Sequence, residues 1–276
     1  MGAPSSPGLI PRLIKDLISL KSYALNDENF TRGIASPSQE SPSPVESLGK
    51  VIGCPRSFLF DINLQCFQVY NTEIQDLLNN NSKLVLKRGM DGPFLDKVKI
   101  DKITDIECMN ASLHKVMQNS KIAETNLNQS SSRSHIFYVL EVVRKISFKD
   151  SEITRRICLV DLAGSEKPAR AAPGTNHENF HDSVKINESL LVLGKCLTSI
   201  KNGDQNIPYR ECKLTQVLFN YISSTKNIIM FSNISQDTAN LDNTIRVLEY
   251  ASSSSSVNLT GLREKLETER KALEKN

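Results

Sequence analysis

Hydroxyl side chains are concentrated in a polar segment at residues 128–135, Asn-Gln-Ser-Ser-Ser-Arg-Ser-His, which leads directly into an apolar run. Oxygen atoms from Asn128, Ser131 and Ser132 on a loop at a sheet edge would suit a phosphate and its Mg²⁺, because Mg²⁺ takes oxygen ligands and keeps several waters. Taken alone, a serine-rich segment of this kind is more often an ordinary loop. Its function therefore depends on what else the chain carries.

A second candidate is the apolar run at residues 157–160, which ends in Asp161 and is followed by Gly164. In P-loop NTPases a carboxylate at the end of a strand supports Mg²⁺, and a nearby glycine leaves its N–H free to approach a phosphate. A buried strand that ends in a glycine-containing turn is the alternative interpretation, with about equal weight.

The third candidate lies in two pieces, Ile-Asn-Glu-Ser-Leu at residues 186–190 and Ile-Pro-Tyr-Arg-Glu-Cys-Lys-Leu-Thr at 207–215. Tyr209, Arg210 and Lys213 make the second piece basic and aromatic. Such a loop between two helices suits an acidic partner. An ordinary solvated loop is the competing interpretation.

These segments need a scaffold, and hydrophobic periodicity indicates one. Apolar residues recur at helical spacing over residues 8–24, and alternation over 57–70 predicts a strand that leads into a short helix ending at 78. Glycine and proline interrupt residues 83–100, which favours a small β-hairpin.

The same rules predict seven further elements. They are helices at 112–119, 184–200, 214–221 and 238–251, and strands at 136–143, 156–161 and 227–234. Strands that alternate with helices, with nearly apolar central strands, predict an α/β sheet covered on both faces.

Composition narrows the class of protein. The chain has 276 residues, 34 basic and 31 acidic side chains, a net charge of +3 and six cysteines. This length excludes a disulfide-stapled mini-protein, the charge gives no argument for nucleic acid, and no apolar run approaches a membrane span. The cysteines form no C-x-x-C pair, which favours reduced thiols in the cytosol. A disordered insertion is expected at about residues 31–56, around a stretch rich in Ser, Pro and Glu.

In this order the motifs N-x-x-S-S-R-S-H, L-V-D-L-A-G-S-E, I-N-x-S-L-x-x-L-G and P-Y-R-x-x-K-L-T resemble the kinesin motor domain. Weaker matches at residues 8–12, 69–78 and 248–251 extend the resemblance over nearly the whole chain. The resemblance implies a P-loop NTPase-like kinesin motor fold. Its central sheet would be mixed and mostly parallel, with helices on its flanks.

The resemblance also implies ATP and Mg²⁺ as cofactors. Asn128, Ser131 and Ser132 would belong to the loop that closes on the γ-phosphate, with Ser132 on Mg²⁺. Asp161 would stand behind the metal, and the N–H of Gly164 would sense the γ-phosphate.

Arg133 and Glu166 match the family's salt-bridged pair, which closes the site and helps to position the attacking water. A bidentate Arg–carboxylate pair suits that task, because it forms only when both loops have moved in.

Microtubules are the partner that the resemblance implies, with a cytoplasmic, cytoskeletal location. The helix from about residue 184, including Asn187, would lie on the microtubule, and Tyr209, Arg210, Lys213 and Leu214 would face acidic tubulin. Residues 259–276 would form the neck linker and the start of a neck coiled coil, which would allow a homodimer. A solvated charged helix is an equal alternative there.

One departure from the family pattern matters most. The match to the family's G-I-I-P-R helix start begins at Gly8, and the phosphate loop G-x-x-x-x-G-K-[ST] occurs nowhere in the chain. Residues 1–258 are therefore expected to be a partial motor domain. Without its first strands, it would have an uncovered sheet edge and uncovered apolar surface.

Two classes of function remain open from the sequence. One is a kinesin ATPase whose phosphate loop is missing from this chain, which alone would not turn over ATP. The other is a non-catalytic, kinesin-derived module for microtubule binding or dimerisation. An unrelated P-loop enzyme is a distant third, because it would not explain P-Y-R-x-x-K-L-T.

Overall fold

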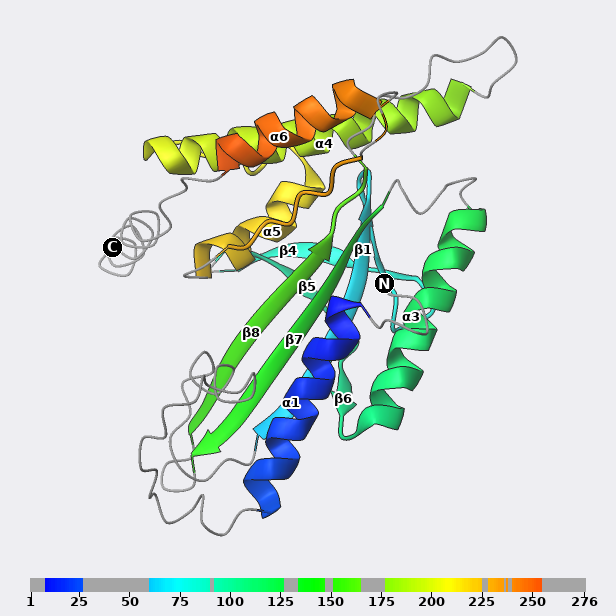
Figure 1. Cartoon of the computed structure of the whole chain (residues 1–276), viewed down its shortest axis with the longest axis vertical. Coiled ribbons are helices and arrows are strands. Elements are labelled where there is room, and N and C mark those ends of the chain that lie inside the picture. The colour runs from blue at the N-terminus through cyan, green and yellow to red at the C-terminus, as the bar shows by residue number, and fades with distance from the viewer. Residues whose placement is uncertain are drawn as a thin grey trace. The chain divides into compact units, whose positions relative to one another are not determined.

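The computed structural model describes residues 8–26, 60–89, 92–126, 134–146, 151–164, 177–224, 228–235, 237 and 240–254 (Figure 1). The expected insertion at about 31–56 and the expected neck at 259–276 lie outside these residues, as do residues 57–59 at the start of the predicted strand. In the described part of the chain, no helix has the length and apolar character needed to cross a bilayer.

The chain divides into two compact units. The first comprises Met1–Cys66, Lys99–Asn119 and Phe137–Leu159. The second comprises Phe67–Val98, Ser120–Ile136 and Val160–Asn276. All contacts of the candidate site described below lie within the second unit.

Helix α1 (Leu9–Asn26) confirms the first predicted helix. Pro11 stands in its first turn, where its missing N–H costs no intrahelical bond. Ile14 and Leu17, spaced three residues apart, are fully buried. The helix is thus held by one apolar face, as its sequence pattern predicts.

The main sheet has the strand order β3-β2-β1-β7-β8, with β6 also paired to β1. Its strands are β1 (Phe60–Tyr70), β2 (Glu73–Asp76), β3 (Ser82–Lys83), β6 (Asp101–Ile103), β7 (His135–Ile146) and β8 (Ser151–Asp161). The pairs β1–β2, β1–β6 and β2–β3 are all antiparallel. The sheet is therefore richer in antiparallel pairs than the expected mostly parallel arrangement, because short turns link several neighbours.

The prediction of a short helix that ends at residue 78 is wrong. The chain instead turns at Asn71 and Thr72 and returns as β2, with Tyr70 opposite Glu73. Asn71 has a φ of 49°, a left-handed conformation that asparagine tolerates in tight turns. After the strand, the carboxylate of Asp76 accepts a hydrogen bond from the Leu78 N–H at 2.9 Å, which fixes a further turn where a helix was expected.

A separate two-stranded sheet confirms the predicted hairpin between residues 83 and 100. It pairs β4 (Val85–Gly89) with β5 (Gly92–Asp96) in antiparallel register. Lys87 and Asp96 form an ion pair across it at 2.6 Å.

Helix α3 (Ile106–Asn126) is much longer than the predicted helix at 112–119. It begins after Asp105, whose carboxylate accepts a hydrogen bond from the Cys108 N–H at 2.8 Å. This cap lowers the pKa of Asp105. Asp at the N-cap satisfies an N–H that the first helical turn cannot, so the helix starts where the cap is.

Strands β7 and β8 confirm the two predicted strands and extend both. Four consecutive residues of β7, from Phe137 to Leu140, are nearly inaccessible, so both faces of this strand are covered. Next to them, Glu141 is mostly buried and accepts a hydrogen bond from the Arg156 side chain of β8 at 2.6 Å. The pair keeps a buried carboxylate from being left without a charged donor.

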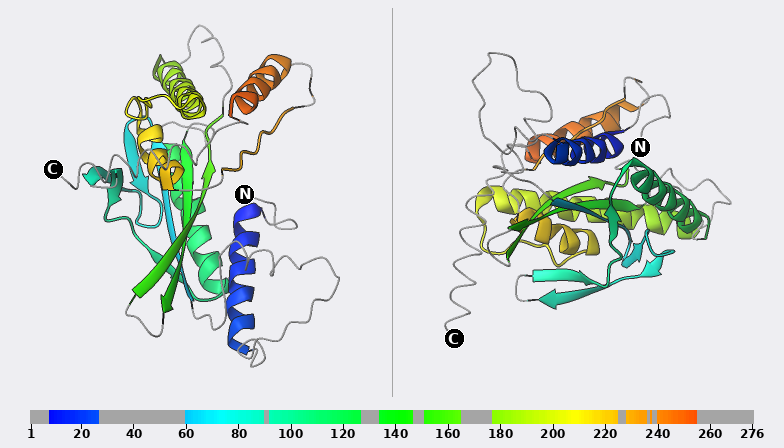
Figure 2. Two further views of the ribbon diagram at one scale, coloured as in Figure 1. Left: turned by 90° about the vertical axis from the view of Figure 1, so that its left-hand side faces the viewer. Right: turned by 90° about the horizontal axis from the view of Figure 1, so that it is seen from below.

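Three helices follow the sheet in sequence: α4 (His177–Asn202), α5 (Lys213–Ser224) and α6 (Leu241–Ser254). Helices α4 and α6 lie side by side (Figure 2). A Cβ at Gly194 of α4 would lie 3.2 Å from the ring of Tyr250 of α6. Each of the three predicted helices is confirmed, although α4 begins earlier than expected.

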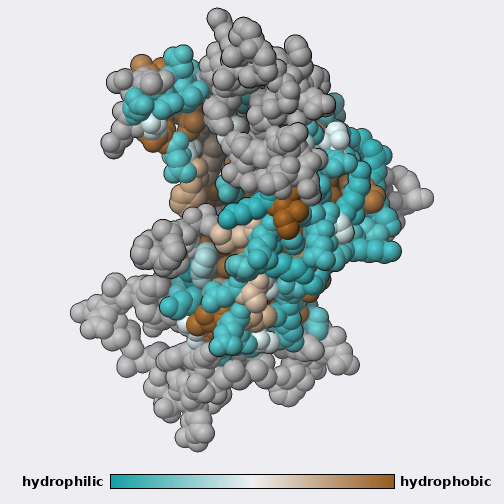
Figure 3. Space-filling model, turned by 90° about the vertical axis from the view of Figure 1, so that its right-hand side faces the viewer, coloured by the Kyte–Doolittle hydropathy of each residue, from teal (hydrophilic) through white to brown (hydrophobic). Residues whose placement is uncertain are grey.

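The strand predicted at 227–234 is wrong for the described residues 228–235, which pair with none of the described strands. Their apolar side chains face solvent: Ile229 is 78% and Phe231 71% exposed. Strand β8 stands at one end of the order of the described strands, and the expected uncovered edge stays a prediction. Hydrophobic residues are visible on the face of the molecule that Figure 3 shows.

This exposure predicts a contrast between two isoleucines of the second unit. Ile229→Ala should change the free energy of unfolding by less than about 0.5 kcal/mol, because little apolar area leaves contact with protein. Ile200→Ala, at a position only 4% exposed, should cost about 2–5 kcal/mol. Chemical denaturation followed by circular dichroism measures both. Equal losses would mean that residues 228–235 are packed in solution.

Candidate functional site

The end of strand β8 carries two of the residues that the sequence assigns to nucleotide. Asp161 is the last residue of the strand and is exposed, and Gly164 is half-buried three residues later. Between them Ala163 is 5% exposed and shares a buried cluster with Tyr70. The other predicted nucleotide-site residues lie outside the described part of the chain: Asn128, Ser131, Ser132, Arg133 and Glu166. The salt bridge between Arg133 and Glu166 therefore stays a prediction.

A functional residue that the sequence analysis did not assign stands at the start of β7. His135 is the last letter of the motif N-x-x-S-S-R-S-H, and its side chain is 3% exposed. Its Nδ1 accepts a hydrogen bond from the Ala163 N–H at 3.0 Å. Its Nε2 lies 3.1 Å from the Ser189 hydroxyl of α4. The imidazole thus bridges the segment after β8 and helix α4.

Burial lowers the pKa of His135 from 6.5 to about 4. The physical cause is loss of solvation, which disfavours the charged imidazolium. The ring is therefore neutral at physiological pH, as a hydrogen bond accepted at Nδ1 requires.

The loop before α5 carries the aromatic and basic residues expected to face a partner. The ring of Tyr209 stacks on that of Phe219 with 3.9 Å between centroids and 14° between planes. Arg210 is exposed, and its guanidinium lies 5.4 Å from the centre of the Tyr209 ring while its Nε donates to the Tyr209 hydroxyl at 3.2 Å. The ring and the hydroxyl of Tyr209 thereby hold the Arg210 side chain in place, and the guanidinium stays accessible to solvent.

Hydrogen bonds fix the backbone of the same loop. The Thr215 hydroxyl donates to the Tyr209 carbonyl at 2.8 Å, and the Gln216 amide donates to the Arg210 carbonyl at 2.8 Å. Both donors belong to the first turn of α5. The helix therefore sets the position of the residues that precede it.

The other predicted contact residues take different places. Lys213 is half-buried at the first position of α5, and Asn187 is half-buried on α4. Leu214 is 1% exposed, so its side chain belongs to the packed interior. We therefore assign Leu214 to packing, because its buried side chain holds the first turn of α5 against the interior.

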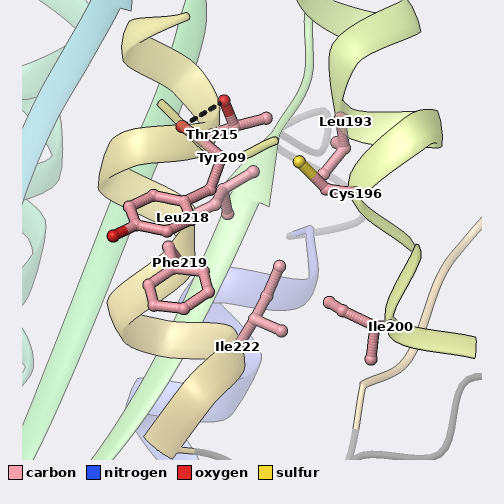
Figure 4. Close-up of a pocket in the computed structure, with 8 residues that line it drawn as sticks. All are labelled: Leu193, Cys196, Ile200, Tyr209, Thr215, Leu218, Phe219 and Ile222. Carbon is pink, nitrogen blue, oxygen red and sulfur yellow. Dashed lines mark hydrogen bonds between the residues drawn. The ribbon is translucent and has the colours of Figure 1, made fainter. Parts of the chain in front are cut away.

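An apolar layer joins α4 to α5 (Figure 4). It lines a small pocket, and Figure 4 shows side chains from the two helices pointing toward one another. The lining residues are Leu193, Cys196, Ile200, Tyr209, Thr215, Leu218, Phe219 and Ile222. Burial raises the pKa of the Cys196 thiol to about 12, so this thiol stays protonated and acts as part of the apolar layer.

The hairpin of β4 and β5 contacts the C-terminal half of α5, and the sequence did not predict this contact. The side-chain amide of Asn220 donates a hydrogen bond to the Pro93 carbonyl. Gly92 beside it has a φ of 115°, and a Cβ there would lie 2.7 Å from the Asn220 side-chain oxygen. The Gly-Pro pair at residues 92–93 was the only local sequence signal, and it indicated a turn without naming its partner.

The described residues supply two of the groups that a bound nucleotide needs. Asp161 offers an exposed carboxylate and Gly164 a backbone N–H, which match the parts that meet Mg²⁺ and a terminal phosphate. The backbone cradle and lysine that hold the β- and γ-phosphates have no counterpart, because the chain contains no G-x-x-x-x-G-K-[ST]. The described residues alone do not form a complete site for ATP–Mg²⁺.

A metal bound by protein side chains alone has no support either. Within the described ranges, no group of three or more His, Cys, Asp or Glu residues is placed to hold an ion.

The fold and this arrangement of strand end, long helix and basic loop define a mixed α/β domain of the P-loop NTPase-like motor class. The family described as "Kinesin motor domain" matches residues 1–257. The chain therefore belongs to the kinesin motor domain family.

Curated relatives agree with this assignment. The chain is 28% identical over 221 residues to "Kinesin-like protein Klp68D" of Drosophila melanogaster, covering 78% of this chain and 27% of the relative. It is 31% identical over 203 residues to "Kinesin-like protein klp-20" of Caenorhabditis elegans, covering 72% and 31%. The aligned part thus spans about a third or less of these relatives.

Solved kinesin structures share the fold. A KIF14 dimer bound to a microtubule with AMP-PNP superposes with a TM-score of 0.72 and 26% identity, covering 93% of this chain and 67% of that one. A fast kinesin superposes with a TM-score of 0.69 and 22% identity, covering 92% and 64%. Both confirm the expected kinesin motor fold.

The buried imidazole predicts a pH dependence of stability. The unfolded His135 takes up its proton near pH 6.5 and the folded one only near pH 4, so the unfolded chain binds more protons between these values. The stability of wild type relative to His135→Asn should therefore fall by about 2 kcal/mol between pH 7.5 and pH 5. Urea denaturation of both proteins at the two pH values measures this difference, and an unchanged difference would contradict a buried neutral ring.

Proposed function

We propose that this chain is the microtubule-engaging part of a kinesin-type motor domain. Kinesin motors couple ATP hydrolysis to movement along microtubules, and this activity would need a phosphate-binding loop in addition to the residues present here. The chain by itself binds microtubules and does not turn over ATP. This assignment places the protein on the cytoplasmic microtubule cytoskeleton.

The loop at residues 207–213 is the observation that carries the proposal. Arg210 is exposed above a stacked aromatic pair, and hydrogen bonds from α5 to the carbonyls of Tyr209 and Arg210 fix the backbone of the loop. A preorganised cation suits an acidic protein surface, because little side-chain freedom remains to be lost on binding. The chain carries a net charge of only +3, so attraction to tubulin depends on local groups such as Arg210 and Lys213.

A non-catalytic kinesin-derived module for microtubule binding or dimerisation is the second candidate. The missing phosphate loop favours it, whereas Asp161 and Gly164 at the end of β8 favour descent from a nucleotide-driven motor. Residues 259–276 are the part of the chain that we propose for dimerisation through a coiled coil, and they lie outside the described residues. Nucleotide dependence of microtubule binding separates the two functions.

Removal of the exposed guanidinium should weaken microtubule binding. Arg210→Ala is expected to raise the Kd for microtubules roughly threefold to tenfold at low salt, with a smaller effect at high salt, because exposed charges are screened. Microtubule co-sedimentation at two ionic strengths measures both values. Arg155→Ala is the matched control, since it removes an exposed arginine from β8 and changes the net charge equally.

The incomplete donor set predicts a negative result for ATP turnover. The 276-residue chain with ATP, Mg²⁺ and microtubules should release phosphate at the rate of a protein-free blank, while a complete kinesin motor domain in the same assay should be active. Stimulation of phosphate release by microtubules would show that other residues of this chain replace the phosphate loop.

A further inference from the structure

His135 connects two elements that are distant in sequence. Its ring receives the N–H of Ala163, two residues beyond the last residue of β8, and reaches Ser189 in the middle of α4. His135 is 3% and Ala163 5% exposed, so water does not compete freely at this point. A buried bridge of this kind couples the positions of its two ends more strongly than a solvated one.

The first hydrogen bond determines the direction of the second. A backbone N–H can only donate, so Nδ1 of His135 carries no proton. In the neutral ring the proton is then on Nε2, and Nε2–H donates to the Ser189 hydroxyl. Both nitrogen atoms are satisfied, each by a different element.

Contacts continue from Ser189 toward the loop at residues 207–213. The Cys212 sulfur lies 3.9 Å from the Ser189 carbonyl oxygen and 3.1 Å from the Thr215 hydroxyl, and its single proton can be donated to one of the two. Thr215 in turn donates to the Tyr209 carbonyl. Figure 4 shows the last of these contacts, between Thr215 and Tyr209, beside the apolar side chains that lie between α4 and α5.

We propose that His135 is a positioning residue that links the backbone at Ala163 to helix α4 and, through Ser189, to the loop that carries Tyr209 and Arg210. A displacement of residues 161–164 either pulls the His135 ring along or breaks its hydrogen bond to the Ala163 N–H. Either change alters the hydrogen bond between the ring and the Ser189 hydroxyl. The relevance to microtubule binding rests on the proposed function. The link itself is a property of the fold.

Two substitutions of His135 each remove one of its two hydrogen bonds and keep the other. The side-chain oxygen of Asn takes the place of Nδ1, so His135→Asn keeps the acceptor for Ala163 and loses the donor to Ser189. The side-chain nitrogen of Gln reaches the place of Nε2, so His135→Gln keeps that donor and loses the acceptor. Ser189→Ala removes the hydroxyl and leaves the histidine intact, and Ser199→Ala on the same helix is the matched control.

Amide hydrogen exchange of the intact chain reads each half separately. In Ser189→Ala and His135→Asn, we expect exchange in residues 189–196 and 212–219 to accelerate roughly fivefold to tenfold, the loss that one hydrogen bond accounts for, while the Ala163 amide stays protected. In His135→Gln the Ala163 amide should accelerate instead. General destabilisation would accelerate all of these amides together.

Two results would overturn the proposal. One is a Ser189→Ala exchange pattern that matches that of Ser199→Ala. The other is equal exchange of the Ala163 amide in His135→Asn and His135→Gln. Long-range ¹H–¹⁵N spectra of the wild-type histidines give a check that does not depend on stability, since the His135 ring must carry its proton on Nε2.

Microtubule co-sedimentation of the same variants tests the connection to function. If the link acts as proposed, Ser189→Ala should change the Kd at least threefold while Ser199→Ala does not, and an unchanged Kd would limit the link to the fold and overturn its role in binding. If wild type does not bind microtubules, the proposed function fails. The exchange pattern still decides whether His135 positions α4.

Discussion

The second unit depends on one requirement, that a polar ring removed from water must find a partner for each of its nitrogens. His135 meets it with the Ala163 N–H on one side and the Ser189 hydroxyl on the other. Each leg contributes a modest net free energy, but leaving either buried group without a partner costs about 1–3 kcal/mol. Strand β7, the segment after β8 and helix α4 are consequently held at one point, from which the apolar layer with α5 extends.

The loop that precedes α5 illustrates how packing orders an exposed charge in a chain whose net charge is only +3. Side-chain entropy normally makes an exposed arginine a poor contact, because it must be ordered on binding. Here the Tyr209 ring and hydroxyl already hold Arg210, and Phe219 holds Tyr209. The proposed contact with an acidic partner therefore depends on local order and not on net charge.

Much of the fold could be predicted from sequence where one pattern had one interpretation. Helix α1 and strands β7 and β8 follow from periodicity, and the hairpin of β4 and β5 follows from Gly and Pro. The failures have physical causes. Residues 72–78 are short enough that the left-handed turn at Asn71 decides their conformation, and the cap at Asp105 sets the residue at which α3 begins. Residues 228–235 have a strand-like composition, but a strand forms only beside another strand.

The candidate site was predictable only as far as motifs name residue types. Motif letters indicated Asp161, Gly164 and the loop around Arg210, yet they could not separate exposed Arg210 from buried Leu214, because burial depends on which side of α5 meets the interior. One of these motifs ends at His135, but the motif alone does not indicate what this residue does. Its role depends on two partners 28 and 54 residues away in sequence, which only the folded chain brings together. A residue that closes a motif and starts a buried strand can therefore serve the site through the elements that it connects.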